Sequence, residues 1–195
     1  MDELKRLLNL ECDRQLTSEQ WDELFALATT LHLKKGEPLI CSGDVDPNIY
    51  IVKEGVMRGV DFNGDRERTF CFGLPGTIFN SRFSFYKGLP SYYQIEACCP
   101  STVLKITRDD YIALTDRSHS FAIWALHYAW WEQYLEEDRE STVHNGSAEE
   151  RYIHMMRTRR TIVEKVSQRI LASYLGVSQE HLSRVKSKLL KNGLI

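Results

Sequence analysis

The sequence predicts an α+β fold in three parts: a β-sandwich or barrel, one long helix and a small helical module. Residues 31–106 hold short apolar or alternating runs separated by Gly or Pro, a pattern typical of a β-sandwich or barrel. Residues 118–145 carry one long apolar stripe at helical spacing. Residues 146–195 indicate short amphipathic helices. We therefore expect three units, at 1–117, 118–145 and 146–195.

Charge is distributed unevenly along the 195 residues, although the formal net charge is only −2. Residues 1–150 carry 15 Lys and Arg against 25 Asp and Glu, a net of −10, whereas residues 151–195 carry 10 against 2, a net of +8. A hydrophobic fraction of 43% is sufficient for a sizeable core. A basic module at the end of an acidic chain makes nucleic acid the first partner to consider.

Two classes of location are disfavoured by the sequence. No apolar run approaches the roughly 18 residues needed to span a bilayer, so we expect no membrane insertion. The chain opens with an Asp-Glu pair after Met1 and lacks the basic-then-apolar layout of a signal peptide, which predicts a cytoplasmic protein.

The cysteines fit a reducing compartment because they are five in number and contain no C-x-x-C pair. We expect all of them to be core thiols: Cys12, Cys41, Cys71, Cys98 and Cys99. The adjacent Cys98 and Cys99 would point to opposite faces of an expected strand, which disfavours joint ligation of one metal.

Helices are expected over the first thirty residues, where Thr17 and Gln20 have the spacing of a capping box. An apolar stripe follows, formed by Trp21, Leu24, Phe25, Leu27 and Ala28. Strands are then expected at 38–41, 49–52, 56–60, 69–72, 95–98 and 103–106, with no helix between them. The Asn63-Gly64 pair predicts a hairpin turn with positive φ at both residues.

The long helix carries aromatic residues along one stripe: Phe121, Trp124, Ala125, Tyr128, Trp131 and Leu135. Such a stripe is usually the face packed on the helix's own domain. Because this helix links two modules, a seam between two copies of the chain is the second hypothesis, with Phe121, Trp124, Tyr128, Trp131 and Leu135 as its residues. Asn145-Gly146 is the expected end of the helix.

The segment 167–190 has the arrangement of a helix-turn-helix motif. The inward positions of the first helix are Ile170, Leu171, Tyr174 and Leu175, and those of the second are Leu182, Val185 and Leu189. Gly176 permits the sharp turn, Val177 is the expected buried turn residue, and Ser178 can cap the second helix.

The outward positions of the second helix carry side chains that suit the major groove of DNA, because Arg, Gln and Glu can bond to base edges. The expected base-reading residues are Gln179, Glu180, Ser183 and Arg184. Phosphate contacts are expected from Arg169, Ser178, Lys186, Lys188 and Lys191. The alternatives are an ordinary helical hairpin with a solvated basic face, and a β-roll module for ligand sensing or protein interaction, whose basic tail binds an acidic protein.

With this motif behind a glycine-punctuated β region and a long helix, the chain resembles the Crp/Fnr family of bacterial transcription regulators. The ordered pattern consists of Gly36-Glu-Pro-Leu39, Gly43-Asp44, Ile49-Tyr-Ile-Val52 with Gly55, then Gly64 and Gly76. The resemblance implies a cyclic-nucleotide-binding-type β-roll, which is a double-stranded β-helix or jelly roll. It also implies a long dimerisation helix and a winged helix-turn-helix that binds palindromic promoter DNA. It also makes a second copy of the chain and RNA polymerase the expected protein partners.

Gln179, Glu180 and Arg184 occupy the positions of the family's Arg, Glu and Arg base readers, so only the first differs in type. That change implies a shifted operator sequence. The family's β-hairpin wing would begin where the chain reaches residues 192–195, so the wing is expected to be truncated. Compensating contacts would come from Arg157, Arg159 and Arg160.

The expected ligand site departs further from the family. The family's Gly-Glu pair is Asn80-Ser81 here, and its Arg followed by a hydroxyl residue is Ser91-Tyr92. Without a cation for the phosphate, cyclic AMP is not the expected effector. The candidate pocket comprises Asn80, Ser81, Arg82, Ser91, Tyr92, Tyr93 and Tyr128. Either another ligand occupies it, or the domain is a scaffold.

No cofactor is expected. An iron–sulfur sensor would need a close N-terminal cysteine cluster, and only Cys12 lies in the first forty residues. Haem is left open, with His32, His119 and His127 as the candidate ligands. A metalloenzyme of the cupin type would need clustered His and Glu on strands, and no nucleophile elbow is present. We therefore predict that the protein is not an enzyme.

Overall fold

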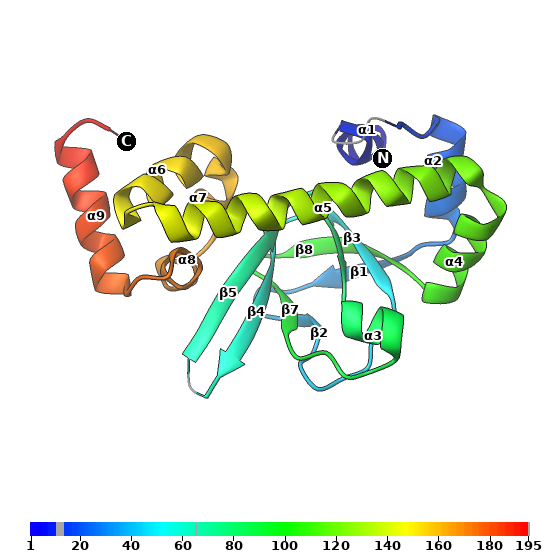
Figure 1. The fold of residues 1–195 in the computed structure, drawn as a ribbon, viewed down its shortest axis with the longest axis horizontal. Helices are drawn as coiled ribbons and strands as arrows, with labels where there is room; N and C mark the ends of the chain where they lie inside the picture. The colour runs from blue at the N-terminus through cyan, green and yellow to red at the C-terminus, as the bar shows by residue number, and fades with distance from the viewer. Residues whose placement is uncertain (11–13, 65, 195) are drawn as a thin grey trace.

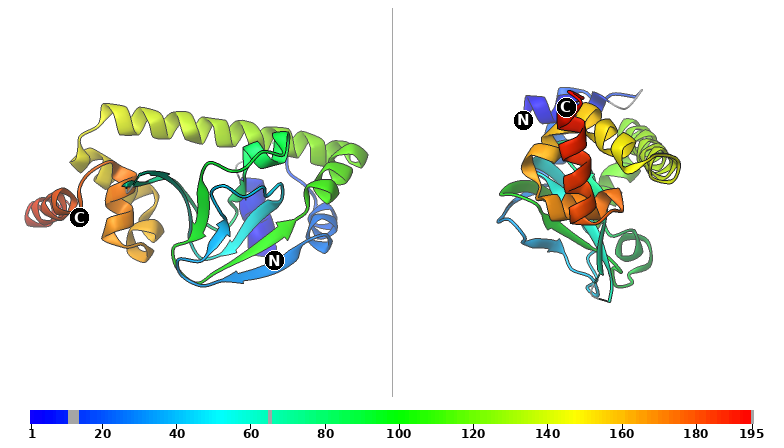
Figure 2. Two further views of the ribbon diagram at one scale, coloured as in Figure 1. Left: turned by 90° about the horizontal axis from the view of Figure 1, so that it is seen from below. Right: turned by 90° about the vertical axis from the view of Figure 1, so that its left-hand side faces the viewer.

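The computed structural model describes residues 1–10, 14–64 and 66–194, and it confirms the order expected from the sequence. Two short helices precede a β-roll, and a long helix then leads to a small helical module (Figure 1). Viewed from below, the roll lies under the long helix and the helical module lies at one end of it (Figure 2).

The first helices are α1 (Asp2–Leu10) and α2 (Ser18–Ala26). The Thr17 hydroxyl accepts from the Gln20 backbone N–H at 3.4 Å, and the Gln20 side chain accepts from the Thr17 N–H at 2.9 Å. The predicted capping box is therefore confirmed. Trp21 and Leu24 on α2 are buried, as expected of a packing face.

The β-roll consists of two four-stranded antiparallel sheets, in the orders β1-β8-β3-β6 and β2-β7-β4-β5. The strands are β1 (Thr29–Leu33), β2 (Pro38–Ile40), β3 (Ile49–Glu54), β4 (Met57–Asn63), β5 (Arg66–Gly73), β6 (Ile78–Asn80), β7 (Gln94–Ala97) and β8 (Ser101–Ile106). Each predicted run overlaps one of these strands. Strands β1 and β6 were not predicted, and helix α3 (Arg82–Lys87) interrupts a region expected to hold no helix.

Two local expectations about the strands are wrong. Asn63 ends β4 opposite Arg66, so the predicted hairpin exists. Among the described residues only glycines have positive φ, so Gly64 has the expected conformation and Asn63 does not. Strand β7 ends at Ala97, so Cys98 and Cys99 follow the strand rather than alternating across it.

Helices α4 (Arg108–Arg117) and α5 (His119–Asn145) follow the roll, and α5 ends before Gly146 as predicted. The C-terminal module comprises α6 (Ala148–Thr158), α7 (Arg160–Lys165), α8 (Gln168–Leu175) and α9 (Gln179–Lys191). None of the helices in the described ranges combines the length and apolar character needed to cross a membrane.

Three buried clusters hold these parts together. One fills the space between the two sheets, and a second joins α1, α2, α4 and the start of α5 to the outer face of β3 and β8. The third is the core of the C-terminal module, and it includes Val56, Phe72 and Cys98 of the roll. The C-terminal helices therefore share one continuous core with the roll.

Candidate nucleic-acid interface and effector site

Helices α8 and α9 meet at the predicted turn. Gly176 has φ +68°, a conformation that costs glycine little, and it ends α8. The Val177 N–H donates to the Ala172 carbonyl at 3.0 Å, and Val177 is half-buried rather than fully buried. The Ser178 hydroxyl accepts from the His181 N–H at 3.1 Å, which confirms its role as the cap of α9.

Helix α9 separates an apolar face from a polar one. Its inward residues Leu182, Val185 and Leu189 are buried. All four residues predicted to read bases, Gln179, Glu180, Ser183 and Arg184, are exposed. An open polar hollow lies along the same helix, lined by Ser183, Arg184, Ser187, Lys188, Lys191 and Asn192. The helix therefore offers hydrogen-bonding side chains on a solvent-facing surface.

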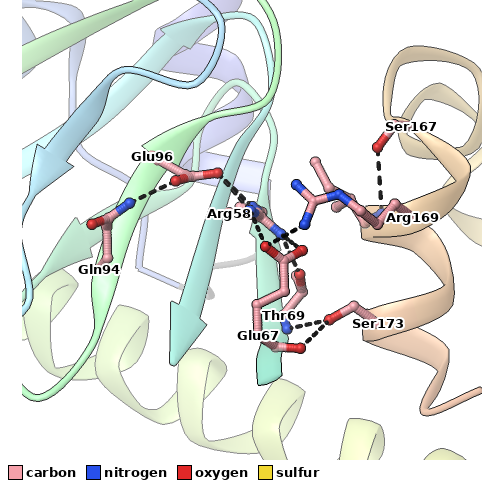
Figure 3. A network of polar contacts seen from close by, with 9 residues as sticks. Arg58, Glu67, Thr69, Gln94, Glu96, Ser167, Arg169 and Ser173 are labelled. Carbon is pink, nitrogen blue, oxygen red and sulfur yellow. Dashed lines mark hydrogen bonds and ion pairs between the residues drawn. The ribbon is translucent and has the colours of Figure 1, made fainter. Parts of the chain in front are cut away.

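The residues predicted to bind phosphate do not form one group. Ser178 and Lys191 are exposed and Lys186 is half-buried, whereas Lys188 Nζ lies 2.6 Å from Glu149 Oε1 of α6. Arg169 Nη1 lies 2.7 Å from Glu67 Oε2 of β5 (Figure 3). In this structure Arg169 therefore faces the β-roll, which its sequence position could not reveal.

Tyr93 occupies the centre of the predicted effector pocket. Its ring is buried edge-on against Phe70, with 5.2 Å between the centroids. Its hydroxyl donates to the Asn80 carbonyl at 2.8 Å and accepts from the Arg82 N–H at 3.3 Å. The neighbouring Tyr92 of the candidate pocket is instead 62% exposed.

The small polar residues of the pocket bond within the protein. The buried Ser91 hydroxyl donates to the Tyr93 carbonyl at 2.8 Å. The buried Ser81 hydroxyl caps α3 by accepting from the Ser84 N–H at 3.3 Å. The Tyr128 hydroxyl of α5 accepts from the Ile78 N–H at 2.8 Å. These hydroxyls thus stabilise the roll itself.

The one cation in the candidate pocket, Arg82, is directed to α5 rather than into the roll. Its Nη1 lies 2.9 Å from Glu136 Oε1, and both side chains are about half exposed. Glu132, one turn earlier on α5, is half-buried nearby. Burial raises the pKa of Glu132 to about 7, with the Glu136 charge adding to the rise and the Arg82 charge opposing it.

The aromatic stripe predicted as a dimer seam packs, over its first residues, against the N-terminal helices of the same chain. Phe121 and Trp124 are 2% and 0% exposed. Trp124 packs edge-on against Trp21 with 4.8 Å between the ring centroids, and its Nε1 donates to the Leu8 carbonyl at 3.3 Å. Phe121 and Trp124 are therefore buried within the same chain and cannot belong to the seam, whereas the assignment of Tyr128, Trp131 and Leu135 to it stays a prediction. Trp131 and Leu135 are half-buried.

A different face of α5 is exposed and apolar. Leu126, Trp130 and Tyr134 are 45%, 62% and 54% exposed and follow one another at intervals of four residues. That spacing places them on one side of the helix. The sequence period could not separate the two faces, because large apolar side chains occur on both.

The described cysteines and histidines do not form a shared metal-ligand set. Cys98 is buried and Cys41, Cys71 and Cys99 are half-buried, all four as free thiols, while Cys12 lies outside the described residues. Burial raises the pKa of Cys71 and Cys98 to about 12, which keeps them protonated. No group of three or more metal-ligating residues occurs in the described ranges.

Known proteins share this architecture. Residues 30–118 match the family Cyclic nucleotide-binding domain. FixK2 from Bradyrhizobium japonicum has 23% identity and a TM-score of 0.71, with 85% of this chain and 86% of that chain covered. Catabolite Activator Protein from Thermus thermophilus has 24% identity and a TM-score of 0.54, with 91% and 85% covered.

A third similar structure is that of a Eubacterium rectale protein assigned to the Crp/Fnr family, with 19% identity, a TM-score of 0.69, and 92% of this chain and 86% of that chain covered. At these identities the likenesses establish the fold. They confirm the resemblance inferred from the sequence. No curated protein matches the sequence significantly.

Replacement of Glu132 by Gln tests the half-buried carboxyl on α5. Because its folded pKa is raised above the ordinary 4.5, the native state favours the protonated form, and stability is lost as pH rises through about 7. In urea denaturation, we expect Glu132→Gln to change the free energy of unfolding little at pH 5 and to raise it by about 1–3 kcal/mol at pH 8. The control is Glu137→Gln, at an exposed position of the same helix. Equal free energies of unfolding for Glu132→Gln and wild type at pH 8 would contradict the raised pKa of Glu132.

Proposed function

We propose that this chain, which contains a cyclic nucleotide-binding domain and has the fold of the Crp/Fnr regulators, is a transcription regulator that binds duplex DNA through helix α9. The observation that carries the proposal is the face of α9, where Gln179, Glu180, Ser183 and Arg184 are exposed behind the cap at Ser178. A capped helix with such a face fits the major groove.

The chemistry of these side chains favours base reading over simple charge attraction. An Arg can donate two hydrogen bonds to guanine, a Gln can bond to adenine in two places, and a Glu can accept from cytosine. The basic balance of residues 151–195, with 10 Lys and Arg against 2 Asp and Glu, supports affinity for phosphates. Contact with RNA polymerase stays a prediction.

A homodimer is part of this proposal, with the exposed face of α5 as its seam. Leu126, Trp130 and Tyr134 form an apolar stripe that a second α5 would cover. Two recognition helices roughly 34 Å apart would then enter successive major grooves on one side of the duplex.

Cyclic AMP is not the proposed effector. Tyr93 fills the space between Phe70 and the Asn80 carbonyl, and Ser91 bonds to the Tyr93 carbonyl. The nearby guanidinium of Arg82 is paired with Glu136. The pocket region therefore offers no cation aimed at a cyclic phosphate, the group that makes phosphate recognition strong.

Two alanine variants test the DNA-reading face. Arg184→Ala should reduce discrimination at one base position of each half-site by about 1–3 kcal/mol, because a bidentate contact is lost. Lys191→Ala should weaken binding to all sequences similarly, as loss of a phosphate contact does. Fluorescence anisotropy with the preferred duplex and its single-base variants measures both. Lys165→Ala, which removes an exposed charge from α7, is the control. Wild-type binding by both α9 variants would show that α9 is not the recognition helix.

The dimer seam is tested at Trp130. Trp130→Glu places a charge in the centre of the stripe, and the mass in sedimentation equilibrium should fall from dimer to monomer. Tyr86→Glu is the matched control, because Tyr86 is 74% exposed on α3 and does not belong to the stripe. A dimeric Trp130→Glu variant would exclude this face as the seam.

Cyclic AMP is tested directly by thermal shift. A ligand that binds only the native state raises its stability by RT ln(1 + [L]/Kd). We expect millimolar cyclic AMP to leave the melting temperature unchanged. The affinity for the operator should also stay the same when cyclic AMP is present. A melting temperature that rises steadily with cyclic AMP concentration would contradict the proposal.

A further inference from the structure

Strand β5 is the edge strand of its sheet, and α8 lies against it (Figure 3). The Ser173 hydroxyl of α8 accepts from the Thr69 N–H at 2.9 Å and donates to the Glu67 carbonyl at 3.1 Å. An edge strand otherwise presents such groups to solvent. A single serine of the helical module thus satisfies two backbone groups of the roll.

Arg58 on the adjacent strand β4 is only 2% exposed and is enclosed by acceptors. Its guanidinium lies 2.6 Å from Glu96, 3.1 Å from Glu67 and 2.9 Å from the Thr69 hydroxyl. A buried guanidinium is costly unless it is paired and hydrogen-bonded. Arg58 therefore requires Glu67 and Glu96 to hold their carboxylates toward it.

Glu67 connects this buried cation to the helical module. One of its carboxylate oxygens lies 3.1 Å from Arg58 Nη1, and the other lies 2.7 Å from Arg169 Nη1 at the start of α8 (Figure 3). Burial alone would raise the pKa of Glu67, but hydrogen bonds from Arg58 and Arg169 outweigh it and lower the pKa. At neutral pH the carboxylate is ionised and bridges two cations.

Apolar contacts lie beside this polar bridge. Phe72 of β5 packs on Tyr174 of α8 with 4.9 Å between the ring centroids. Phe72 also belongs to the same buried cluster as Leu175, Leu182 and Val185. Since α8 and α9 share that core across the Gly176 turn, a fixed α8 fixes the direction of α9.

We propose that Arg58 and Glu67 are positioning residues that hold the recognition helix at one orientation on the β-roll. Arg58 fixes the Glu67 carboxylate, Glu67 fixes Arg169 and the start of α8, and α8 fixes α9. In a homodimer this orientation determines the spacing between the two recognition helices. This inference rests on the proposed DNA-binding function, but its first step is a property of the protein alone.

The first test measures amide hydrogen exchange in the full-length protein without DNA. The Thr69 N–H bonds across the contact to Ser173, so its exchange reports separation of α8 from β5. Glu67→Gln should make Thr69 exchange about threefold to tenfold faster. Combining it with Arg169→Gln should add no further acceleration if both changes break the same contact.

The matched control is Arg68→Gln on the same strand. Arg68 pairs with Asp61 within the β4–β5 hairpin and its side chain is 71% exposed, so its loss should leave Thr69 exchange unchanged. Exchange at Val103, deep in the roll, reports global stability in every variant. Unchanged Thr69 exchange in Glu67→Gln, or equal acceleration in Arg68→Gln, would overturn the inference.

The second test measures operator spacing, which a purely structural role would not affect. The wild type should bind one half-site spacing more tightly than a duplex whose spacing differs by one base pair. In Glu67→Gln the ratio of these two affinities should move closer to one. Retention of the wild-type ratio despite faster Thr69 exchange would overturn the positioning role. A wild type that binds no duplex would instead contradict the proposed function, with the exchange result still interpretable.

Discussion

The contact between α8 and the edge of β5 is the interaction on which the arrangement of the molecule depends. Without it, Thr69 and Glu67 would expose backbone groups at a sheet edge, and the Glu67 carboxylate would lose its ion pair with Arg169 of α8. The same contact places Val56 and Phe72 of the roll in the core of the helical module. Domains within one chain often move freely, but a shared apolar core restrains them.

Helix α5 connects the parts of the molecule through two distinct faces. One face carries Phe121 and Trp124, which pack with Trp21 into the chain's own core. The other carries Trp130 and its neighbours at intervals of four residues, exposed to solvent. The first face ties α5 to the roll, and the second gives the proposed partner copy a surface. A change in the roll would therefore reach both the seam and the helical module.

The interior of the roll is arranged for packing. Tyr93 and Phe70 meet edge-on, and Tyr93 also bonds to the backbone of Asn80 and Arg82. Polar groups that a ligand would need are used to hold the strands and α3 in place. This arrangement supports the proposed regulator, in which protein contacts would orient the DNA-binding helices.

Most of the fold was predictable because its signals are local. Alternating runs identified six of the strands, and Ser178 with Gly176 identified the turn and the cap of α9. Strand β1 was missed because it is short and mostly solvent-facing, and α3 was missed because six residues cannot establish a helical period.

The positions that join the units were not predictable, because their partners are distant in the sequence. Thr69 and Ser173 are 104 residues apart, and Arg58 looked like an ordinary charge in an alternating strand. The two faces of α5 were confused for a related reason, since periodicity identifies apolar positions but not the neighbour that covers them.

Selection of bound sites from a random duplex library tests the central claim most directly, because it reports DNA binding, two-fold symmetry and helix orientation together. The account predicts a palindrome with half-site centres about one helical turn apart and one dominant spacing. Bound sequences that lack two-fold symmetry, or half-sites scattered over many spacings, would contradict it.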